Sequence, residues 1–347
     1  MAGPPPALPP FPTQPGDVPW PTREWTRGPL PPGLDAEGFD RAVRALTELG
    51  PEDGVTRAVL VVHRGRLVFE HYGPETDRTS TLQSWSMAKS LLHALVGRLV
   101  GRGAIDLDAP APVPEWQDRG DPRAAIRWRD LLRMRPGLAF AEDYVDSGVS
   151  DVIEMLWGRG RDDVAGYAAS KPLAAEPGTR FNYSSGTSNI VARAVGGLVG
   201  DGEAGMRRFM QEALFAPLGM HSPVPKFDAA GTWKGSSFCF CTAEDFARFG
   251  LLYLRGGLWE GGPLLPTGWA DDARTPTHHT TEEAYGSHWW IEPEDVRHFY
   301  ASGYEGQRLL LAPEKDVLAL RLGVSPNERV PALLRPLHAL VRAFPDL

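Results

Sequence analysis

Residues 84–100 read SWSMAKSLLHALVGRLV and form the most apolar helical stretch of this 347-residue chain. Its apolar side chains follow the i, i+4, i+5, i+8 spacing of a buried helix: Met87, Leu91, Leu92, Leu95, Val96, Leu99 and Val100. The stretch opens on an S-x-x-K pattern made by Ser86 and Lys89. Residues i and i+3 share a helix face, so the Lys89 side chain can reach the Ser86 hydroxyl. A serine becomes nucleophilic when a neighbour takes its proton, which makes this pair a candidate catalytic centre.

Strands are predicted on both sides of this helical region. Two β-rich runs, 58–62 and 67–72, flank a short turn and indicate a hairpin. Four further runs lie near the C-terminus, at 288–292, 297–301, 308–312 and 317–323. Their links are too short for parallel crossovers, so we expect an antiparallel sheet. Trp289 and Trp290 should point to opposite faces of their strand, one into the core and the other available to a cleft.

Helical patterns occupy most of the chain between the two β-rich blocks. They cover 128–134, 149–157, 188–199, 205–214 and 243–254, and two more helices are expected at 34–49 and 333–344. We therefore predict an α+β fold with an antiparallel sheet flanked by helices and an inserted, mainly helical lobe. The sheet lobe would comprise residues 34–83 and 285–347, and the helical lobe residues 84–284. The site would lie at the interface of the two lobes.

Composition limits the remaining possibilities. Twelve of the 33 prolines fall between Pro4 and Pro32, so residues 1–33 are predicted to be an extended arm that packs partly through Trp20 and Trp25. A disordered linker is the alternative for residues 1–16. The net charge of −8 argues against nucleic acid as the main partner. No secretory signal and no run of 18 apolar residues is visible, so we expect a cytoplasmic protein without a membrane partner. Cys239 and Cys241 are interpreted as buried thiols rather than a metal site.

Further motifs give the S-x-x-K pattern its meaning, because alone it is a weak signal. The G-x-S-x-G, H-E-x-x-H and Walker A patterns are absent. The chain does contain, in order, a Pro-Gly-Thr-x-Phe-x-Tyr-Ser segment at 177–184, a T-x-x-D-F-A-R-F-G segment at 242–250 and an Ala-Ser-Gly segment at 301–303. In this order and spacing they resemble the penicillin-recognising serine hydrolases. That group includes class C β-lactamases, DD-peptidases, family VIII esterases and 6-aminohexanoate-dimer hydrolases, and it implies a β-lactamase-like fold.

The resemblance implies a role for each matching residue. Ser86 would be the nucleophile, and Lys89 would help to remove its proton. The segment at 177–184 corresponds to the second motif of these enzymes, and Tyr183 matches the tyrosine of that motif. Either Lys89 or Tyr183 could be the general base, and the sequence leaves that choice open. The backbone N–H groups of Ser86 and Tyr304 would form the oxyanion hole.

Two departures from the usual motifs narrow the expected substrate. Ala301 stands where β-lactamases and peptidases carry a lysine, and Ser185 stands in place of asparagine. Both changes resemble the esterase and aminohexanoate-oligomer branch, whose D-Y-V-D segment is matched at 143–146. The resemblance therefore makes Tyr144 a candidate lid contact and places Ser185, Ser302 and Gly303 among the substrate-binding residues.

These observations predict a serine hydrolase that cleaves small esters or linear amides through a Ser86 acyl-enzyme. No metal or organic cofactor is implied, and the expected partner is a small-molecule substrate. A weak β-lactamase or D-amino-acid peptidase is the alternative enzyme. A non-catalytic relative that binds a ligand is the alternative from another class.

Overall fold

The computed structural model describes residues 8–143 and 150–347. The chain divides into two compact units. The sheet unit contains Met1–Met87, Phe215–Pro223 and Phe240–Leu347, and the helical unit contains Ala88–Leu214 and Val224–Cys239. The sheet unit thus takes in residues 84–87, 215–223 and 240–284, which the predicted bounds place in the helical lobe. The longest of these segments, 240–284, belongs to the sheet unit because helix α9 (Ala243–Leu254) packs on three strands of the sheet, β1, β12 and β13.

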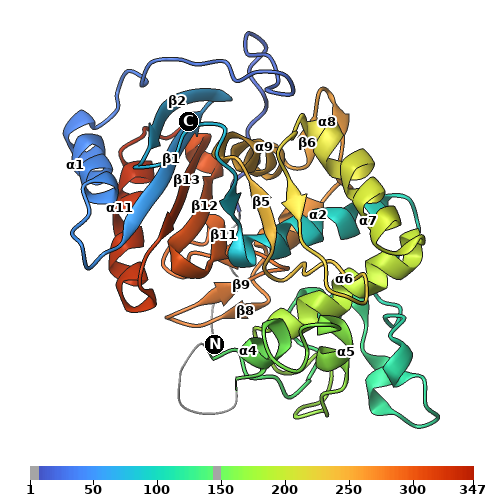
Figure 1. The fold of residues 1–347 in the computed structure, drawn as a ribbon. Coiled ribbons are helices and arrows are strands. Elements are labelled where there is room, and N and C mark those ends of the chain that lie inside the picture. The colour runs from blue at the N-terminus through green and yellow to red at the C-terminus, as the bar shows by residue number, and fades with distance from the viewer. Residues whose placement is uncertain (1–7, 144–149) are drawn as a thin grey trace, which may run out of the picture. The chain divides into compact units, whose positions relative to one another are not determined.

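The sheet unit is built on an eight-stranded sheet with the order β2-β1-β13-β12-β11-β10-β9-β8 (Figure 1). Neighbouring strands pair antiparallel throughout, which confirms the predicted antiparallel sheet. Their bounds are β1 Val55–His63, β2 Arg66–Tyr72, β8 His278–His279, β9 Ala284–Tyr285, β10 Trp290–Ile291, β11 Phe299–Gly303, β12 Gln307–Ala312 and β13 Val317–Val324. Both ends of the chain therefore supply strands to one sheet.

Helices pack on both faces of this sheet. Helices α1 (Ala36–Thr47) and α11 (Val330–Arg342) share a core with Leu310 of β12. The preceding residue, Leu309, points the other way and meets α9, where a side chain at Gly250 would lie 2.8 Å from its Cδ1 atom. Trp289 is fully buried on that side against Phe299, so it is the core member of the predicted tryptophan pair.

The helical unit is formed by six α-helices and shorter turns within the part of the chain that the structure describes. The helices are α2 (Ala88–Gly101), α3 (Trp128–Leu132), α4 (Asp151–Leu156), α5 (Val164–Ala169), α6 (Ser185–Val199) and α7 (Gly202–Met210). A π-helical turn, Gln211–Phe215, follows α7, and short 3₁₀ turns lie at Pro114–Trp116 and Pro122–Ala125. The short strand β4 (Val224–Pro225) also belongs to this unit.

Short elements complete the sheet unit. The helices are α8 (Ala216–Leu218) and α10 (Trp269–Arg274), and the strands are β3 (Leu82–Gln83), β5 (Cys239–Cys241), β6 (Leu258–Trp259) and β7 (Gly262–Pro263). Its 3₁₀ turns are Trp85–Met87, Tyr304–Gly306, Pro313–Lys315 and Asn327–Arg329. Within residues 8–143 and 150–347, no helix is long and apolar enough to cross a membrane.

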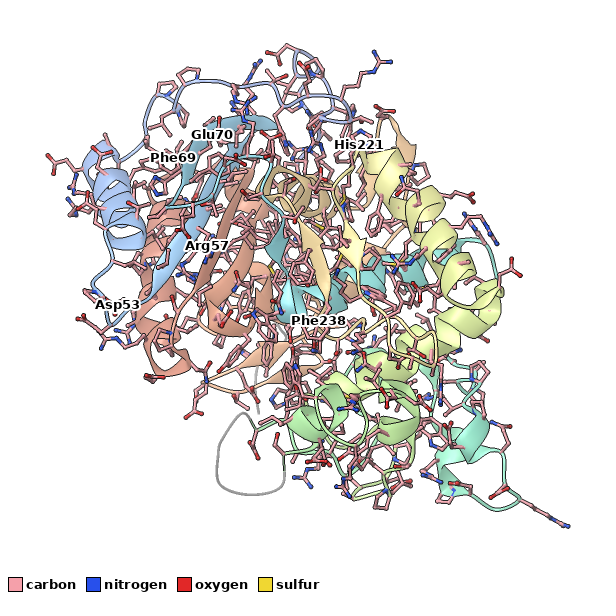
Figure 2. The ribbon with its side chains drawn as sticks, in the orientation of Figure 1. Asp53, Arg57, Phe69, Glu70, His221 and Phe238 are labelled. Carbon is pink, nitrogen blue, oxygen red and sulfur yellow. The ribbon has the colours of Figure 1, made fainter. Side chains whose placement is uncertain are left out.

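The proline-rich arm packs on the sheet unit over most of its described length. Trp25 is only 4% exposed, and its indole N–H donates to the Glu244 carbonyl at 3.3 Å. Arg27 forms a salt bridge with Glu70, a residue of β2. Glu70 is labelled in Figure 2. Trp20 packs on Trp259 with their ring centroids 4.9 Å apart. The two arm tryptophans therefore make the contacts that the sequence predicts for them.

Candidate active site

Ser86 lies in a turn that belongs to the sheet unit. Strand β3 pairs with Phe240 and Cys241 of β5, and the chain then enters the 3₁₀ turn Trp85–Met87. The Met87 N–H donates to the Ser84 carbonyl at 3.2 Å and closes this turn. Ser86 is half-buried. Helix α2 begins only at Ala88, so the S-x-x-K pattern spans a 3₁₀ turn and the start of an α-helix rather than one regular α-turn.

Lys89 is buried in the helical unit with polar partners around its ammonium group. Its side-chain nitrogen donates to the Ser185 hydroxyl at 3.0 Å and to the Ser236 carbonyl at 2.9 Å. The same nitrogen lies 4.9 Å from the centre of the Tyr183 ring. Burial lowers the pKa of Lys89 to about 8, and the nearby Glu142 carboxylate partly opposes that shift. With its pKa lowered to about 8, part of the Lys89 population is neutral near neutral pH, and this neutral form can accept a proton.

Glu142 completes the surroundings of this lysine. The Ser185 N–H donates to one carboxylate oxygen of Glu142 at 2.7 Å, and the Ser185 hydroxyl donates to the other at 2.5 Å. Burial raises the pKa of Glu142, and Lys89 and the two hydrogen bonds from Ser185 act in the opposite direction. Ser185 thus accepts from the lysine and donates to the carboxylate, so its hydroxyl links the two charged groups.

The second-motif tyrosine is held by its neighbours in the helical unit. The Asn182 N–H donates to the Met134 carbonyl at 2.8 Å, and the Asn182 side chain donates to the Phe140 carbonyl at 3.1 Å. Directly after Tyr183, the Ser184 hydroxyl accepts from the Thr187 N–H and caps α6. These contacts fix the segment between a loop and a helix start, with Tyr183 half-buried beside Lys89.

The third motif is the Ala-Ser-Gly segment at 301–303, which forms the end of strand β11 in the sheet unit. A β-carbon at Gly303 would lie 2.4 Å from the Ser84 carbonyl oxygen, so glycine is required where β11 meets the chain just before Ser86. Tyr304 begins the next 3₁₀ turn, and its ring packs edge-on against Trp85 at 5.3 Å. Ser302 pairs with Arg308 of β12, and its role in substrate binding stays a prediction.

The structure thus groups the predicted residues within each unit. Lys89, Tyr183 and Ser185 lie together in the helical unit. Ser86 has its sequence neighbours Ser84 and Trp85 packed against the third motif in the sheet unit. Tyr144 lies outside the described residues.

Two contacts were missed by the sequence reasoning. The first is Glu142. It lies in the same E-D-Y-V-D segment as Tyr144, and this position was the only sequence feature that could have indicated a place for it near the site. Ser236 contributes a backbone carbonyl, which no side-chain motif reveals.

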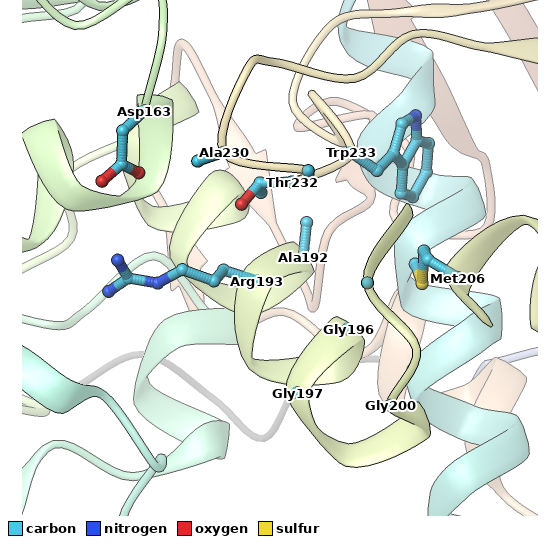
Figure 3. A pocket seen from close by; sticks show the side chains of 12 residues that line it. Asp163, Ala192, Arg193, Gly196, Gly197, Gly200, Met206, Ala230, Thr232 and Trp233 are labelled. Carbon is cyan, nitrogen blue, oxygen red and sulfur yellow. The ribbon is translucent and has the colours of Figure 1, made fainter. Parts of the chain in front are cut away.

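A separate cavity of about 390 Å³ opens in the helical unit (Figure 3). It is lined by the C-terminal part of α6, including Gly196 and Gly197, and by Met206 and Trp233. The four residues around the Lys89 amine are not part of its lining: Glu142, Tyr183, Ser185 and Ser236. In the parts of the chain described, no three His, Cys, Asp or Glu side chains are grouped so that they could hold a metal ion.

Comparison with known proteins identifies the family. The sequence model of the family described as Beta-lactamase matches residues 39–324. The chain belongs to this family. A 6-aminohexanoate-dimer hydrolase from Paenarthrobacter ureafaciens is 28% identical over 330 residues, which cover 87% of this chain and 81% of that protein. This β-lactamase family member is therefore a hydrolase related to that enzyme.

Solved structures confirm the β-lactamase-like fold. A structure described as a 6-aminohexanoate-dimer hydrolase from Bacillus anthracis has a TM-score of 0.74 at 18% identity and covers 96% of this chain and 89% of its own. A structure described as a β-lactamase from Bacteroides dorei has a TM-score of 0.67 at 20% identity and covers 89% of this chain and 99% of its own. The predicted family and the α+β fold are both confirmed.

Proposed function

We propose that this β-lactamase family member is a serine hydrolase that cleaves small esters or linear amides through a Ser86 acyl-enzyme. The observation that carries the proposal is the buried Lys89 amine, whose pKa is lowered to about 8 and whose neighbours are Tyr183 and Ser185. A lysine placed in this way can take a proton at neutral pH.

The reaction has two halves. In the first, the Ser86 oxygen attacks the substrate carbonyl carbon and gives its proton to the Lys89–Tyr183 pair. The bond to the leaving alcohol or amine then breaks, and the leaving group receives that proton. In the second half, water attacks the acyl carbon and gives a proton to the Lys89–Tyr183 pair. The bond between the acyl carbon and the Ser86 oxygen then breaks, the pair returns the proton to that oxygen, and the acid departs. The backbone N–H groups of Ser86 and Tyr304 would stabilise the oxyanion in both halves.

The substrate class follows from what the third motif lacks. Ala301 has no charge to attract a carboxylate at the place where β-lactamases and peptidases carry a lysine. This favours esters and linear amides over β-lactams. The relative from Paenarthrobacter ureafaciens, named for its action on the 6-aminohexanoate dimer, supports a linear amide as one substrate.

The test combines covalent labelling with a substrate panel. Wild type should react with a fluorophosphonate probe at Ser86, and peptide mass spectrometry should locate the adduct there. The Ser86→Ala variant should lose both labelling and hydrolysis of p-nitrophenyl butyrate and the 6-aminohexanoate dimer, whereas Ser80→Ala should retain both. Hydrolysis that survives Ser86→Ala would refute the nucleophile. Nitrocefin as the only substrate would favour a β-lactamase, and a chain that neither labels nor hydrolyses would be a non-catalytic relative.

A further inference from the structure

Two residues of the sheet unit adopt a backbone conformation that their side chains disfavour. Trp85 has a φ of 44° and Glu305 a φ of 62°, both in the left-handed region. For a bulky residue such as tryptophan this conformation is a real outlier. Trp85 directly precedes Ser86, and Glu305 directly follows Tyr304. The two strained residues therefore flank the two backbone N–H groups proposed for the oxyanion hole.

One hydrogen bond joins these two residues. The indole N–H of Trp85 donates to a carboxylate oxygen of Glu305 at 2.8 Å. The Trp85 ring also packs edge-on against Tyr304, with an interplanar angle of 75°. The Trp85 side chain thus contacts Tyr304 and Glu305, two of the three residues of the 3₁₀ turn Tyr304–Gly306. Strained conformations persist only where surrounding contacts hold them, and this hydrogen bond is one such contact.

The turn is also fixed from the sheet side. Arg321 of β13 is fully buried, and its guanidinium donates to the carbonyls of Glu305 and Gly306 at 3.3 and 2.8 Å. Gln307 donates to the Tyr304 carbonyl at 2.9 Å. These donors occupy the carbonyl groups of three successive residues. The turn that carries the Tyr304 N–H is therefore clamped by the sheet on one side and by Trp85 on the other.

The backbone geometry connects this clamp to the reaction. The N–H of Ser86 lies in the peptide plane that joins it to Trp85, so the dihedral angles of Trp85 set its direction. Donors of an oxyanion hole work by being aligned before charge develops, and small misalignments reduce their effect. Release of the Trp85 side chain would let its backbone relax toward a common conformation and would turn the Ser86 N–H.

We infer that the Trp85–Glu305 hydrogen bond is a latch that aligns the backbone N–H groups of Ser86 and Tyr304 for oxyanion stabilisation. Both are positioning residues, because they act through the backbone groups beside them. The inference rests on the proposed function, since a latch of this kind has a role only if Ser86 forms an acyl-enzyme.

The test removes each half of the hydrogen bond while it keeps the shape of the side chain. Trp85→Phe keeps an aromatic ring against Tyr304 but has no indole N–H, and Glu305→Met keeps the length of the side chain without its oxygens. Each should lower kcat on p-nitrophenyl butyrate by about 10- to 100-fold, less than the loss of a whole oxyanion donor, with KM changed by less than about threefold. Glu305→Gln retains an acceptor oxygen and should stay within about threefold of wild type, since the indole N–H keeps its partner.

Further measurements separate the latch from a general structural role. The Trp85→Phe/Glu305→Met double variant should be no slower than the worse single variant, because both remove one interaction. The pH of half-maximal kcat/KM should stay unchanged, as the surroundings of Lys89 are intact. Trp259→Phe is the matched control. It removes the hydrogen bond from the Trp259 indole N–H to the Thr22 hydroxyl, which also lies in the sheet unit, and it should retain wild-type kcat.

Each outcome decides the matter. Multiplying effects in the double variant, a Glu305→Gln variant as slow as Glu305→Met, or a change in KM alone would overturn the latch. A melting temperature near that of wild type shows that the variants fold, and a slow variant that is unfolded is replaced by Glu305→Asp, whose shorter side chain should also slow kcat. Wild-type hydrolysis that depends on Ser86 shows that the proposed function stands when the latch fails. If wild type shows no Ser86-dependent reaction, the proposed function falls and the latch with it.

Discussion

At the residue scale, the charge state of Lys89 should control the pH dependence of the reaction. Its pKa is lowered from 10.5 to about 8 by burial, so the amine gains its proton-accepting form as pH rises through that value. We expect kcat/KM to rise from acid pH and to level off above pH 8. Measuring kcat/KM for p-nitrophenyl butyrate hydrolysis between pH 5.5 and 9 gives this rising limb of the pH profile. A rate independent of pH over this range would contradict a role for Lys89 as base.

Substitution of Glu142 offers a sharper test of how nearby charge sets the pKa of Lys89. Its carboxylate raises the pKa of Lys89, so Glu142→Gln should move the rising limb to lower pH. The exposed neighbouring carboxylate, changed in Asp143→Asn, is the matched control and should shift the limb much less. The quantity compared is the pH at which kcat/KM reaches half of its maximum, measured for wild type, Glu142→Gln and Asp143→Asn. A shift toward higher pH in Glu142→Gln would show that the carboxylate acts on Lys89 in another way.

The same residues show how far sequence reasoning reaches at this scale. Lys89, Tyr183 and Ser185 were predicted from motifs, which specify residue type and order. Glu142 meets Ser185 across 43 positions of the chain, and only the folded backbone brings the two together. The left-handed conformation of Trp85 was equally hidden, because tryptophan gives no signal for a positive φ.

At the scale of the element, helix α6 carries glycines in two different environments. A β-carbon at Gly197 would meet open space, whereas one at Gly186 would lie 2.5 Å from the Phe140 ring. Gly197→Ala should therefore stabilise the protein by about 0.5–1 kcal/mol, since alanine loses less backbone entropy in a helix. Gly186→Ala is the matched change in the same helix and should destabilise, because the ring must shift. Urea denaturation gives both free energies of unfolding, and equal effects at the two sites would contradict this account.

Length and periodicity explain which elements the sequence predicts. The predicted helix at 243–254 coincides with α9, and the 12-residue α1 falls inside the predicted 34–49. Strands β8 and β9, of two residues each, and helix α5, of six residues, were missed. Helix α6 begins at Ser185 rather than at the predicted 188, because Ser184 caps it there.

At the scale of the whole molecule, composition located the proline-rich arm but gave none of its contacts. Its partners come from distant parts of the sheet unit: the Arg248 guanidinium donates to the Pro21 carbonyl at 2.8 Å, and that of Arg255 donates to the Gln14 side chain at 3.0 Å. Arg255 also forms a buried salt bridge with Asp316. The arm therefore covers charged side chains that the sheet unit would otherwise expose. Proline content predicts an extended chain, and only the tryptophans indicated that it would pack.

The arm should accordingly contribute to the stability of the sheet unit, and Trp25 is the residue that tests this. Because its side chain is 4% exposed, Trp25→Ala should cost about 3–5 kcal/mol through the cavity it leaves, with its hydrogen bond to Glu244 lost as well. Leu30→Ala, at a site that is 36% exposed in the same arm, should change the free energy of unfolding by less than about 0.5 kcal/mol. Urea denaturation of both variants supplies the comparison. If Trp25→Ala unfolds at the same urea concentration as Leu30→Ala, the arm lies on the sheet unit without stabilising it. A large difference between the two variants would make the proline-rich arm an integral part of the sheet unit's core.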